Sequence, residues 1–194
     1  AALRRIKKIY GRVTNNNTFS AHSIKVAEAA KALENIQRDV NIALMNEVSK
    51  VFNKLEISTY DVLDAASTKW NFHKYSPGLV GGHCISVDPY YLLHCFNQMG
   101  SSSLIINAAR SVNESMIEHV SSLLVRSILK KKGELSGAIL FYGLSFKEDV
   151  GDFRNSKSIA LVEQLKNMGM NVFVNDPYMR NLPADSKLMA DGTI

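Results

Sequence analysis

Cysteine is scarce in this sequence of 194 residues, which contains only Cys84 and Cys95. Two cysteines are too few for a disulfide framework, so we expect a protein of a reducing compartment, the cytoplasm. The sequence also lacks any run of the roughly 18–20 apolar residues that a membrane-spanning helix needs, and it lacks the pattern of a signal peptide. We therefore expect no membrane partner.

Sequence motifs for binding nucleic acid are missing as well. The chain has no zinc-finger spacing, no RNP motif and no aromatic side chains interleaved with basic ones. Part of its net charge of +5 lies in the run RRIKKIYGR, residues 4–12. A solvated helix face explains this run better than a contact with nucleic acid does. The apolar content of 46% is ordinary for a globular protein with a packed core.

Apolar side chains at spacings of three and four predict several helices between residues 23 and 132, with a loop over residues 70–88. After a polar loop over 13–22, Ser23 is expected to cap a helix that runs to about Leu55. Its apolar stripe is longer than one small domain can cover, so we expect it to pack at an interface between two copies. The stripe consists of Leu33, Ile36, Val40, Leu44, Val48, Val51 and Leu55.

Shorter helices follow, and the pattern then changes at Gly133. We expect one helix to start at Ser58, a second to start near Pro89, and a long one to run from about Leu104 to Lys132. Beyond Gly133, the apolar runs AILFYG and NVFVN predict two strands, with an amphipathic helix between them that Asn155 or Ser156 caps. Such a β-α-β unit favours parallel strands. One unit is too small for a stable sheet, so we expect the chain to be a fragment.

The segment GLVGGHCISVDPYYL, residues 78–92, surrounds Cys84 with glycines. Glycines beside a thiol indicate a sharp bend, or something that approaches the backbone closely. Asp88 follows four residues later at an expected helix start, whose positive end favours a thiolate. A structural glycine loop with an incidental cysteine explains the spacing equally well.

Two other kinds of cysteine site receive little support. The His-Cys dipeptides at 83–84 and 94–95 suggest zinc, but adjacent side chains diverge and rarely bind one ion, so we expect no metal. A hydrolase that uses His73, His94 or His119 as the base has no local signature.

Two polar patterns allow a functional interpretation beside an ordinary one. Lys31 and Asn35 lie one turn apart and could stabilise an oxyanion, although a polar stripe opposite the core is the simpler explanation. The loop GLSFKEDVGDFRNS, residues 143–156, places Lys147 and Arg154 after a strand and before a helix, where phosphates bind. An ordinary charged loop is an equal alternative.

Three segments together resemble the UDP-glucose/GDP-mannose dehydrogenase family of nucleotide-sugar 6-dehydrogenases. They are SIKVAEAAKALENIQRDVNIALMNE, KWNFHKYSPGLVGGHCISVDPYYL and LSFKEDVGDFRNSKS, and the similarity covers about residues 20–178. The resemblance implies an α plus α/β fold: an all-helical central dimerisation domain, followed by the start of a Rossmann-like parallel-sheet domain that binds the UDP-sugar. It divides the chain into a basic segment and loop (1–22), the central domain (23–132) and the partial sheet domain (133–194). The NAD-binding domain of the family has no counterpart here.

The resemblance also implies site residues. Cys84 matches the catalytic cysteine, Asp88 the aspartate that helps to activate water, and Lys31 and Asn35 the pair that flanks the reacting C6. Residues implied to bind ligands are Lys147, Tyr75 and Gly81 for the UDP-sugar and Arg154 for the phosphates of NAD.

The implied activity is a two-step oxidation of the sugar C6 alcohol to a carboxylate by a cytoplasmic homodimer. GGHC followed by VDPYYL is typical of the bacterial branch that acts on UDP-N-acetylhexosamines for surface polysaccharides. UDP-glucose enzymes tend to have serine and lysine where this chain has His83 and Val87. We therefore expect UDP-N-acetylglucosamine or UDP-N-acetylgalactosamine, with UDP-N-acetylmannosamine, UDP-glucose and GDP-mannose as alternatives. A non-catalytic dimerisation or sugar-nucleotide-binding module remains the other class of function.

Overall fold

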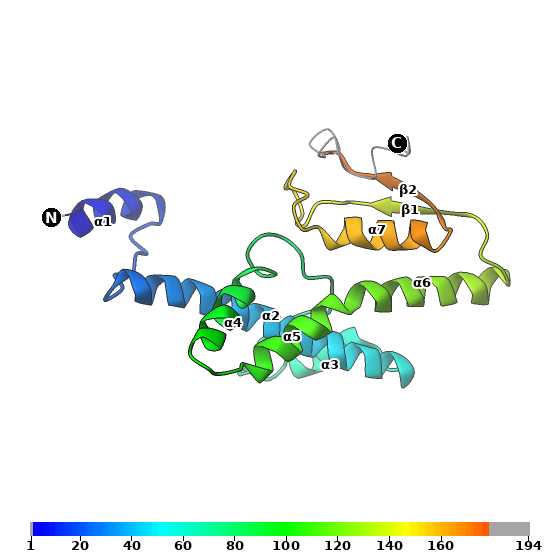
Figure 1. Ribbon diagram of the computed structural model, residues 1–194, viewed down its shortest axis with the longest axis horizontal. Coiled ribbons are helices and arrows are strands. Elements are labelled where there is room, and N and C mark those ends of the chain that lie inside the picture. Colours follow the sequence, from blue (N-terminus) through cyan, green and yellow to red (C-terminus); the bar gives the residue numbers. More distant parts are fainter. Residues whose placement is uncertain (1, 179–194) are drawn as a thin grey trace. The chain divides into compact units, whose positions relative to one another are not determined.

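The computed structural model describes residues 2–178, within which seven helices and two strands follow one another (Figure 1). The described residues form two compact units, 2–34 and 35–178. The elements are α1 (Ala2–Val13), α2 (Ile24–Lys54), α3 (Thr59–Ala66), α4 (Asp88–Gln98), α5 (Leu104–Glu114), α6 (Met116–Lys132), β1 (Ala138–Tyr142), α7 (Lys157–Asn167) and β2 (Asn171–Asn175).

The first unit contains α1 and the beginning of α2. The basic run 4–12 lies within α1, as the helix-face interpretation expects. A tight turn follows, in which Asn15 and Asn16 have positive φ angles of 49° and 64°, a conformation that asparagine tolerates better than most residues do. The hydroxyl of Ser23 accepts a hydrogen bond of 3.2 Å from the backbone N–H of Val26. This bond confirms the predicted cap of α2.

The helices of the second unit begin and end close to the predicted positions, with one exception. Ser58 caps α3 by accepting from the N–H of Asp61, and Gly133 ends α6 in the left-handed conformation. The prediction of one helix from Leu104 to Lys132 is wrong, because the helix is interrupted at Ser115. The hydroxyl of Ser115 donates to the carbonyl of Val112 at 2.7 Å, a local bond that competes with regular helix geometry.

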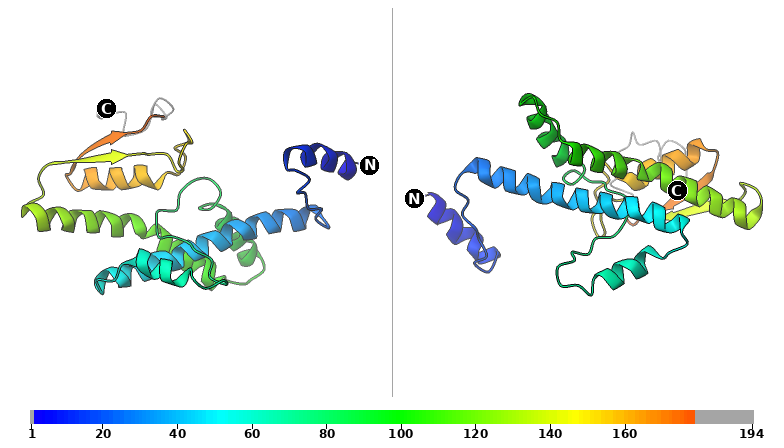
Figure 2. Two further views of the ribbon diagram at one scale, coloured as in Figure 1. Left: turned by 180° about the vertical axis from the view of Figure 1, so that it is seen from behind. Right: turned by 90° about the horizontal axis from the view of Figure 1, so that it is seen from below.

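The two strands form the predicted β-α-β unit. β1 and β2 are parallel, with Ala138 opposite Asn171 and Tyr142 opposite Asn175, and α7 connects them after the cap at Ser156. Figures 1 and 2 show α7 between this small sheet and α6. The buried cluster of this layer consists of Leu144, Phe153, Leu161, Val162, Leu165, Met170, Val172 and Val174, with Ile117, Val120, Leu124 and Ile128 of α6 packed against it.

Candidate active site

The predicted nucleophile lies in the irregular segment between α3 and α4. Cys84 is exposed, and its carbonyl accepts hydrogen bonds from the N–H groups of Val87 at 3.0 Å and Asp88 at 2.8 Å. These bonds form a turn that leads directly into α4, of which Asp88 is the first residue. Thiol and carboxylate are therefore carried by the two ends of one turn.

The carboxylate of Asp88 is held from α2. Asn35, which is 2% exposed, donates a hydrogen bond of 2.6 Å from Nδ2 to Oδ2 of Asp88. The structure thus brings together two of the predicted catalytic residues. Lys31 belongs to the other compact unit, where its ammonium pairs with Glu34 at 2.6 Å. Its catalytic role stays a prediction.

The glycines before Cys84 permit close contact with the segment that precedes α7. Gly82 has a φ of +86°, and a Cβ there would lie 2.7 Å from Cδ2 of Phe146. A Cβ on Gly81 would lie 2.7 Å from the carbonyl oxygen of Asn155 and 3.2 Å from the backbone N of Lys157. The segment that approaches the two glycines closely is therefore part of the protein itself: a side-chain ring at Gly82 and the backbone at Gly81. The assignment of Gly81 to the substrate stays a prediction.

His83 and Ser86 fix the loop further. The ring of His83 packs edge-on against Phe146, with 5.5 Å between the centroids and an interplanar angle of 81°, and its Nδ1 lies 3.7 Å from Oδ2 of Asp152. The hydroxyl of Ser86 donates to the carbonyl of Gly82 at 2.5 Å. The residue that directly precedes the thiol is thus packed against the loop that follows β1.

Arg154 is exposed and is oriented by Asp152. Its Nε donates to both carboxylate oxygens at 2.9 and 3.1 Å, and its Nη2 donates at 2.5 Å. These side-chain hydrogen bonds, a further one from the backbone N–H of Arg154, and the charges of Arg154 and His83 hold the pKa of Asp152 well below its ordinary value. The guanidinium is therefore a cation in a defined orientation after β1, where the sequence predicted a phosphate contact.

Lys147 lines an open hollow of about 510 Å³ at the carboxyl end of β1, together with Tyr142, Gly143, Ser145, Phe146 and Glu148. Asp176, which follows β2, accepts from the N–H group of Leu144 at 2.7 Å and from that of Ser145, which lines the hollow, at 3.2 Å. Burial would raise the pKa of Asp176, but its backbone hydrogen bonds outweigh burial and lower the pKa. The hydroxyl of Tyr75 lies elsewhere and donates to Oε1 of Gln37 on α2 at 3.2 Å.

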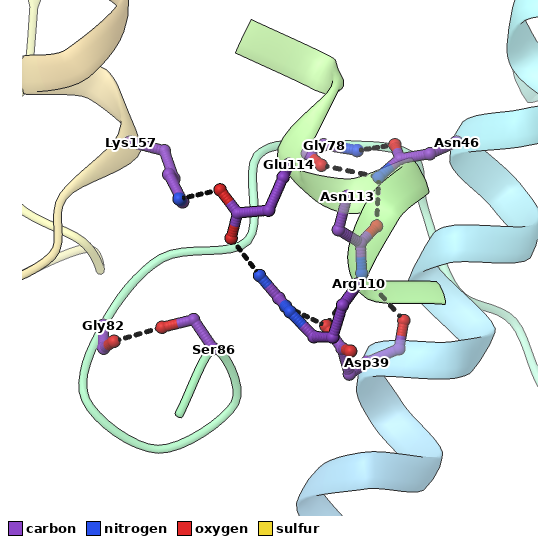
Figure 3. Close-up of polar contacts among 9 residues, drawn as sticks. All are labelled: Asp39, Asn46, Gly78, Gly82, Ser86, Arg110, Asn113, Glu114 and Lys157. Carbon is purple, nitrogen blue, oxygen red and sulfur yellow. Dashed lines mark hydrogen bonds and ion pairs between the residues drawn. The ribbon is translucent and has the colours of Figure 1, made fainter. Parts of the chain in front are cut away.

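A partly buried ionic cluster of Asp39, Arg110, Glu114 and Lys157 was not predicted (Figure 3). Arg110 donates from Nη1 to Oδ1 of Asp39 at 2.6 Å, with side chains that are 3% and 0% exposed. Its Nη2 donates to Glu114, which also accepts from Nζ of Lys157. Burial would lower the pKa of Arg110, yet the hydrogen bond to Tyr90 and the charges of Asp39 and Glu114 raise it. The guanidinium therefore stays charged.

Two asparagines extend this cluster to the loop. Asn113 donates to the carbonyl of Asp39 at 3.0 Å and to its Oδ1 at 2.7 Å, and Asn46 donates to Oδ1 of Asn113 at 2.8 Å. The only sequence signal is that Arg110, Asn113 and Glu114 share one face of a helix at spacings of three and four. Nothing local identifies Asp39 or Asn46 as their partners.

The alternative cysteine sites were a zinc site and a hydrolase site with His73, His94 or His119 as the base. Within residues 2–178, no group of three His, Cys, Asp or Glu side chains is arranged to hold a metal ion. Nε2 of His94 lies 2.9 Å from the amide of Gln98. Burial and the charges of Lys50, Arg126 and Lys54 lower the pKa of His119.

Of the helices that the structure describes, none is long and apolar enough to cross a membrane.

Comparison with known protein families identifies the family to which the chain belongs. The profile of the UDP-glucose/GDP-mannose dehydrogenase family, central domain, matches residues 25–115. The profile of the family's UDP binding domain matches residues 140–191. The chain belongs to this family. The first match contains the second segment of the resemblance and all but two residues of the first, and the second match contains the third segment.

Individual relatives of the UDP-glucose/GDP-mannose dehydrogenase family include Protein CapL from Staphylococcus aureus, 49% identical over 172 residues (88% of this chain and 41% of the relative). UDP-N-acetyl-D-glucosamine 6-dehydrogenase from Pseudomonas aeruginosa is 47% identical over 175 residues (90% and 42%). A UDP-N-acetyl-D-mannosamine dehydrogenase from Methanococcus aeolicus is 34% identical over 178 residues (90% and 39%). The chain thus spans about two-fifths of the length of these relatives.

Solved structures of family members have the same fold. The UDP-D-ManNAc dehydrogenase of Pyrococcus horikoshii superimposes with a TM-score of 0.74 at 30% identity, covering 90% of this chain and 42% of that one. A structure of the UDP-N-acetyl-mannosamine dehydrogenase Cap5O from Staphylococcus aureus gives a TM-score of 0.70 at 30% identity, covering 92% and 42%. The expected helical part with a small parallel sheet is confirmed.

Proposed function

We propose that the chain is the part of an NAD-dependent UDP-N-acetylhexosamine 6-dehydrogenase that carries the nucleophile and the sugar-nucleotide site. One observation carries the proposal: an exposed Cys84 lies one turn before Asp88, whose carboxylate is held by the buried amide of Asn35. Thiol, carboxylate and amide are the groups that the second oxidation and the hydrolysis require. Membership of the dehydrogenase family supports this interpretation.

The roles follow from the order of the chemical steps. The C6 alcohol first loses a hydride and its hydroxyl proton and becomes an aldehyde. The thiolate of Cys84 adds to the aldehyde to form a thiohemiacetal, whose oxidation by loss of a second hydride gives a thioester. Asp88 takes a proton from the water that attacks the thioester, which releases the carboxylate and regenerates the thiolate. Asn35 orients Asp88, and with Lys31 it stabilises negative charge on oxygen.

NAD, when bound, supplies the acceptor for both hydrides. The residue that we assign to it is Arg154, whose exposed guanidinium fits a phosphate and is oriented by Asp152. The sequence contains no GxGxxG motif, so this chain does not itself account for the rest of dinucleotide binding. Lys147, beside the hollow after β1, is the cation that we assign to the diphosphate of the UDP-sugar.

The sugar that we favour is N-acetylglucosamine or N-acetylgalactosamine. Relatives named UDP-N-acetyl-D-glucosamine 6-dehydrogenase are 46–47% identical to the chain, whereas those named UDP-N-acetyl-D-mannosamine dehydrogenase are 32–34% identical. Formation of NADH by the intact protein with a panel of UDP-N-acetylhexosamines, UDP-glucose and GDP-mannose tests this choice. Highest kcat/KM with UDP-glucose or GDP-mannose would refute it.

We also propose that a second copy covers the exposed part of the apolar stripe on α2. Leu44 and Val51 are both 52% exposed, whereas Ile36 on the same helix is 4% exposed. Burial of such side chains favours association by roughly 25 cal/mol per Å² of apolar surface. Sedimentation should show a dimer, and a monomer at every concentration would refute the proposal.

The non-catalytic module remains the alternative for the 194-residue chain taken alone. It predicts that the chain binds UDP-sugars and self-associates but forms no NADH, because the sequence has no dinucleotide fingerprint. Comparing NADH formation by this chain and by the intact protein separates the two. No NADH from the intact protein with any nucleotide sugar would favour the module.

A further inference from the structure

Residues 78–87, the part of the irregular segment that carries Cys84 and that we call the thiol loop, are held at Gly78 by an asparagine of α2. Oδ1 of Asn46 accepts a hydrogen bond of 2.7 Å from the N–H of Gly78, and Nδ2 of the same amide donates to the carbonyl of Gly78 at 3.0 Å (Figure 3). Asn46 is completely buried. Both main-chain polar groups of Gly78 are therefore bound by one side chain.

The amide of Asn46 is itself fixed in one orientation. Its Nδ2 also donates to Oδ1 of Asn113 at 2.8 Å, and Asn113 is anchored in turn by its two bonds to Asp39. Exchanging the oxygen and nitrogen of Asn46 would place two donors, or two acceptors, opposite each other at all three contacts. These three hydrogen bonds, which we call the Asn46 clamp, therefore have one geometry. They run from the buried amides of Asn46 and Asn113 to the exposed Gly78, and breaking them would leave a buried amide unpaired, which is costly.

We propose that Asn46 is a positioning residue for the Cys84 thiol, acting through the main chain of Gly78. Asn46 and Asn35 are eleven residues apart on α2, about three helical turns, so they lie on the same face. Asn46 holds the beginning of the loop, and Asn35 holds its end through Asp88. One face of a single rigid helix thus fixes both ends of the segment that contains the thiol.

Asn46 binds the main-chain N–H and carbonyl of Gly78, and a side chain at this position would not disturb these bonds. A Cβ on Gly78 would meet no atom within 4 Å, and its φ lies outside the left-handed region. Gly78→Ala keeps the N–H and the carbonyl that Asn46 binds, so it is a control that changes the residue and preserves the clamp. Asn41→Ala is a second control, because the amide of Asn41 bonds only within α2, to the carbonyl of Gln37 at 2.6 Å.

The first measurement is amide hydrogen exchange over residues 79–87 in the 194-residue chain. Asn46→Ala should speed amide exchange in the loop about tenfold, because the hydrogen bonds that restrain Gly78 are lost. Asn46→Asp keeps the acceptor for the N–H of Gly78 and should also speed exchange in the loop. Exchange in β2 (Asn171–Asn175) should change less than about twofold. Neither control should alter the loop. Unchanged loop exchange, or an equal rise in the loop and in β2, would overturn the proposal.

The second measurement uses the intact protein and rests on the proposed function. Asn46→Asp should lower kcat at least about tenfold while KM for the UDP-sugar stays within about threefold, because the nucleophile is misplaced and the sugar-nucleotide pocket is untouched. A higher KM with unchanged kcat would overturn the positioning role. Faster loop exchange with normal kcat and KM would also overturn the positioning role, whereas carboxylate formation at a normal rate by Cys84→Ala would refute the proposed function and leave the restraint of the loop by Asn46 standing.

Discussion

The amide of Asn35 donates to the carboxylate of Asp88 at 2.6 Å, although the two residues are 53 positions apart in the chain. The donor is 2% exposed, so no water can easily take its place. This hydrogen bond connects the long helix α2 to the first residue of α4. It orients the carboxylate of Asp88 toward α2.

Asn35→Asp would place two carboxylates within hydrogen-bonding distance. Like charges raise the apparent pKa of such a pair above the value in the unfolded chain, so stability is lost as pH rises from about 4 through that raised pKa. We expect a loss of about 1–3 kcal/mol at pH 7 and recovery near pH 4, measured by urea denaturation. Asn41→Asp, on the same helix, should show no such dependence. An equal loss at both pH values would refute the pairing.

Gly82→Ala should disturb the thiol loop more than an ordinary substitution in the left-handed region. A Cβ at Gly100, which has a φ of +69° and no atom within 4 Å, would cause only backbone strain. A Cβ at Gly82 would cause the same strain and would also clash with the ring of Phe146. We expect Gly100→Ala to cost about 1–2 kcal/mol and Gly82→Ala to cost more. Adding Phe146→Ala should recover part of the difference in a double-mutant cycle. Additive effects would show that the ring does not limit residue 82.

Asp176 should stabilise the protein in a pH-dependent way. Because its folded-state pKa is lowered, its contribution is complete above the ordinary carboxyl pKa, near 4, and is lost as pH falls through the folded value. Asp176→Asn should cost about 2 kcal/mol at pH 7, on the scale of hydrogen bonds to a charged group, and much less at pH 3. Denaturant unfolding at the two pH values measures this. The reverse trend would contradict the lowered pKa.

Cys84→Ala in the intact protein should stop the reaction near the aldehyde. The first oxidation needs no thiol, while the second needs the covalent adduct, so carboxylate formation should fall by several orders of magnitude. Reduction of added 6-aldehyde sugar by NADH should persist, and His83→Ala should have a much milder effect. Cys95→Ala, on the exposed surface of α4, is the matched control. A normal rate of carboxylate formation by Cys84→Ala would refute the thiohemiacetal mechanism.

Lys147→Ala in the intact protein should weaken binding of the UDP-sugar and spare binding of NAD. A charge-assisted phosphate contact contributes roughly 1.5–3 kcal/mol, or about ten- to a hundredfold in affinity. Calorimetry with UDP, which lacks the sugar, should show the same loss if the contact is to the diphosphate. Lys130→Ala, on the exposed end of α6, should change neither affinity. Unaltered UDP affinity in Lys147→Ala would remove this residue from the site.

Local chemistry explains which parts of the fold were predictable. Ser58 and Gly133 signal helix ends through bonds to their own neighbours, and the apolar runs on both sides of α7 signal a β-α-β crossover. The break at Ser115 was missed because a serine within a helical pattern is compatible with a continuous helix. Its hydroxyl bond to Val112 becomes visible only in three dimensions.

The residues of the candidate site also differ in whether the sequence alone could identify them. Asp88, Asn35 and Cys84 were assigned through a family resemblance carried by short motifs, and the structure joins the first two. Asp39 and Arg110 form the best-buried ion pair of the described residues, yet they are 71 positions apart, and no local pattern connects them. Long-range pairing of this kind depends on the packing of α2 against α5, which spacing along the chain does not encode.

Glu114 accepts from Arg110 on one side and from Lys157 on the other. The same α6 that continues from Glu114 also supplies Leu124 and Ile128 to the cluster around the sheet. Separating the chain into two pieces near Gly133 would thus remove the apolar side chains of α6 that pack against α7. It would also separate the Glu114 carboxylate from Lys157, one of its two cations. We therefore expect the helical layer and the sheet layer of residues 35–178 to unfold together, so that the hollow after β1 and the loop that carries Cys84 form, or are lost, in one transition.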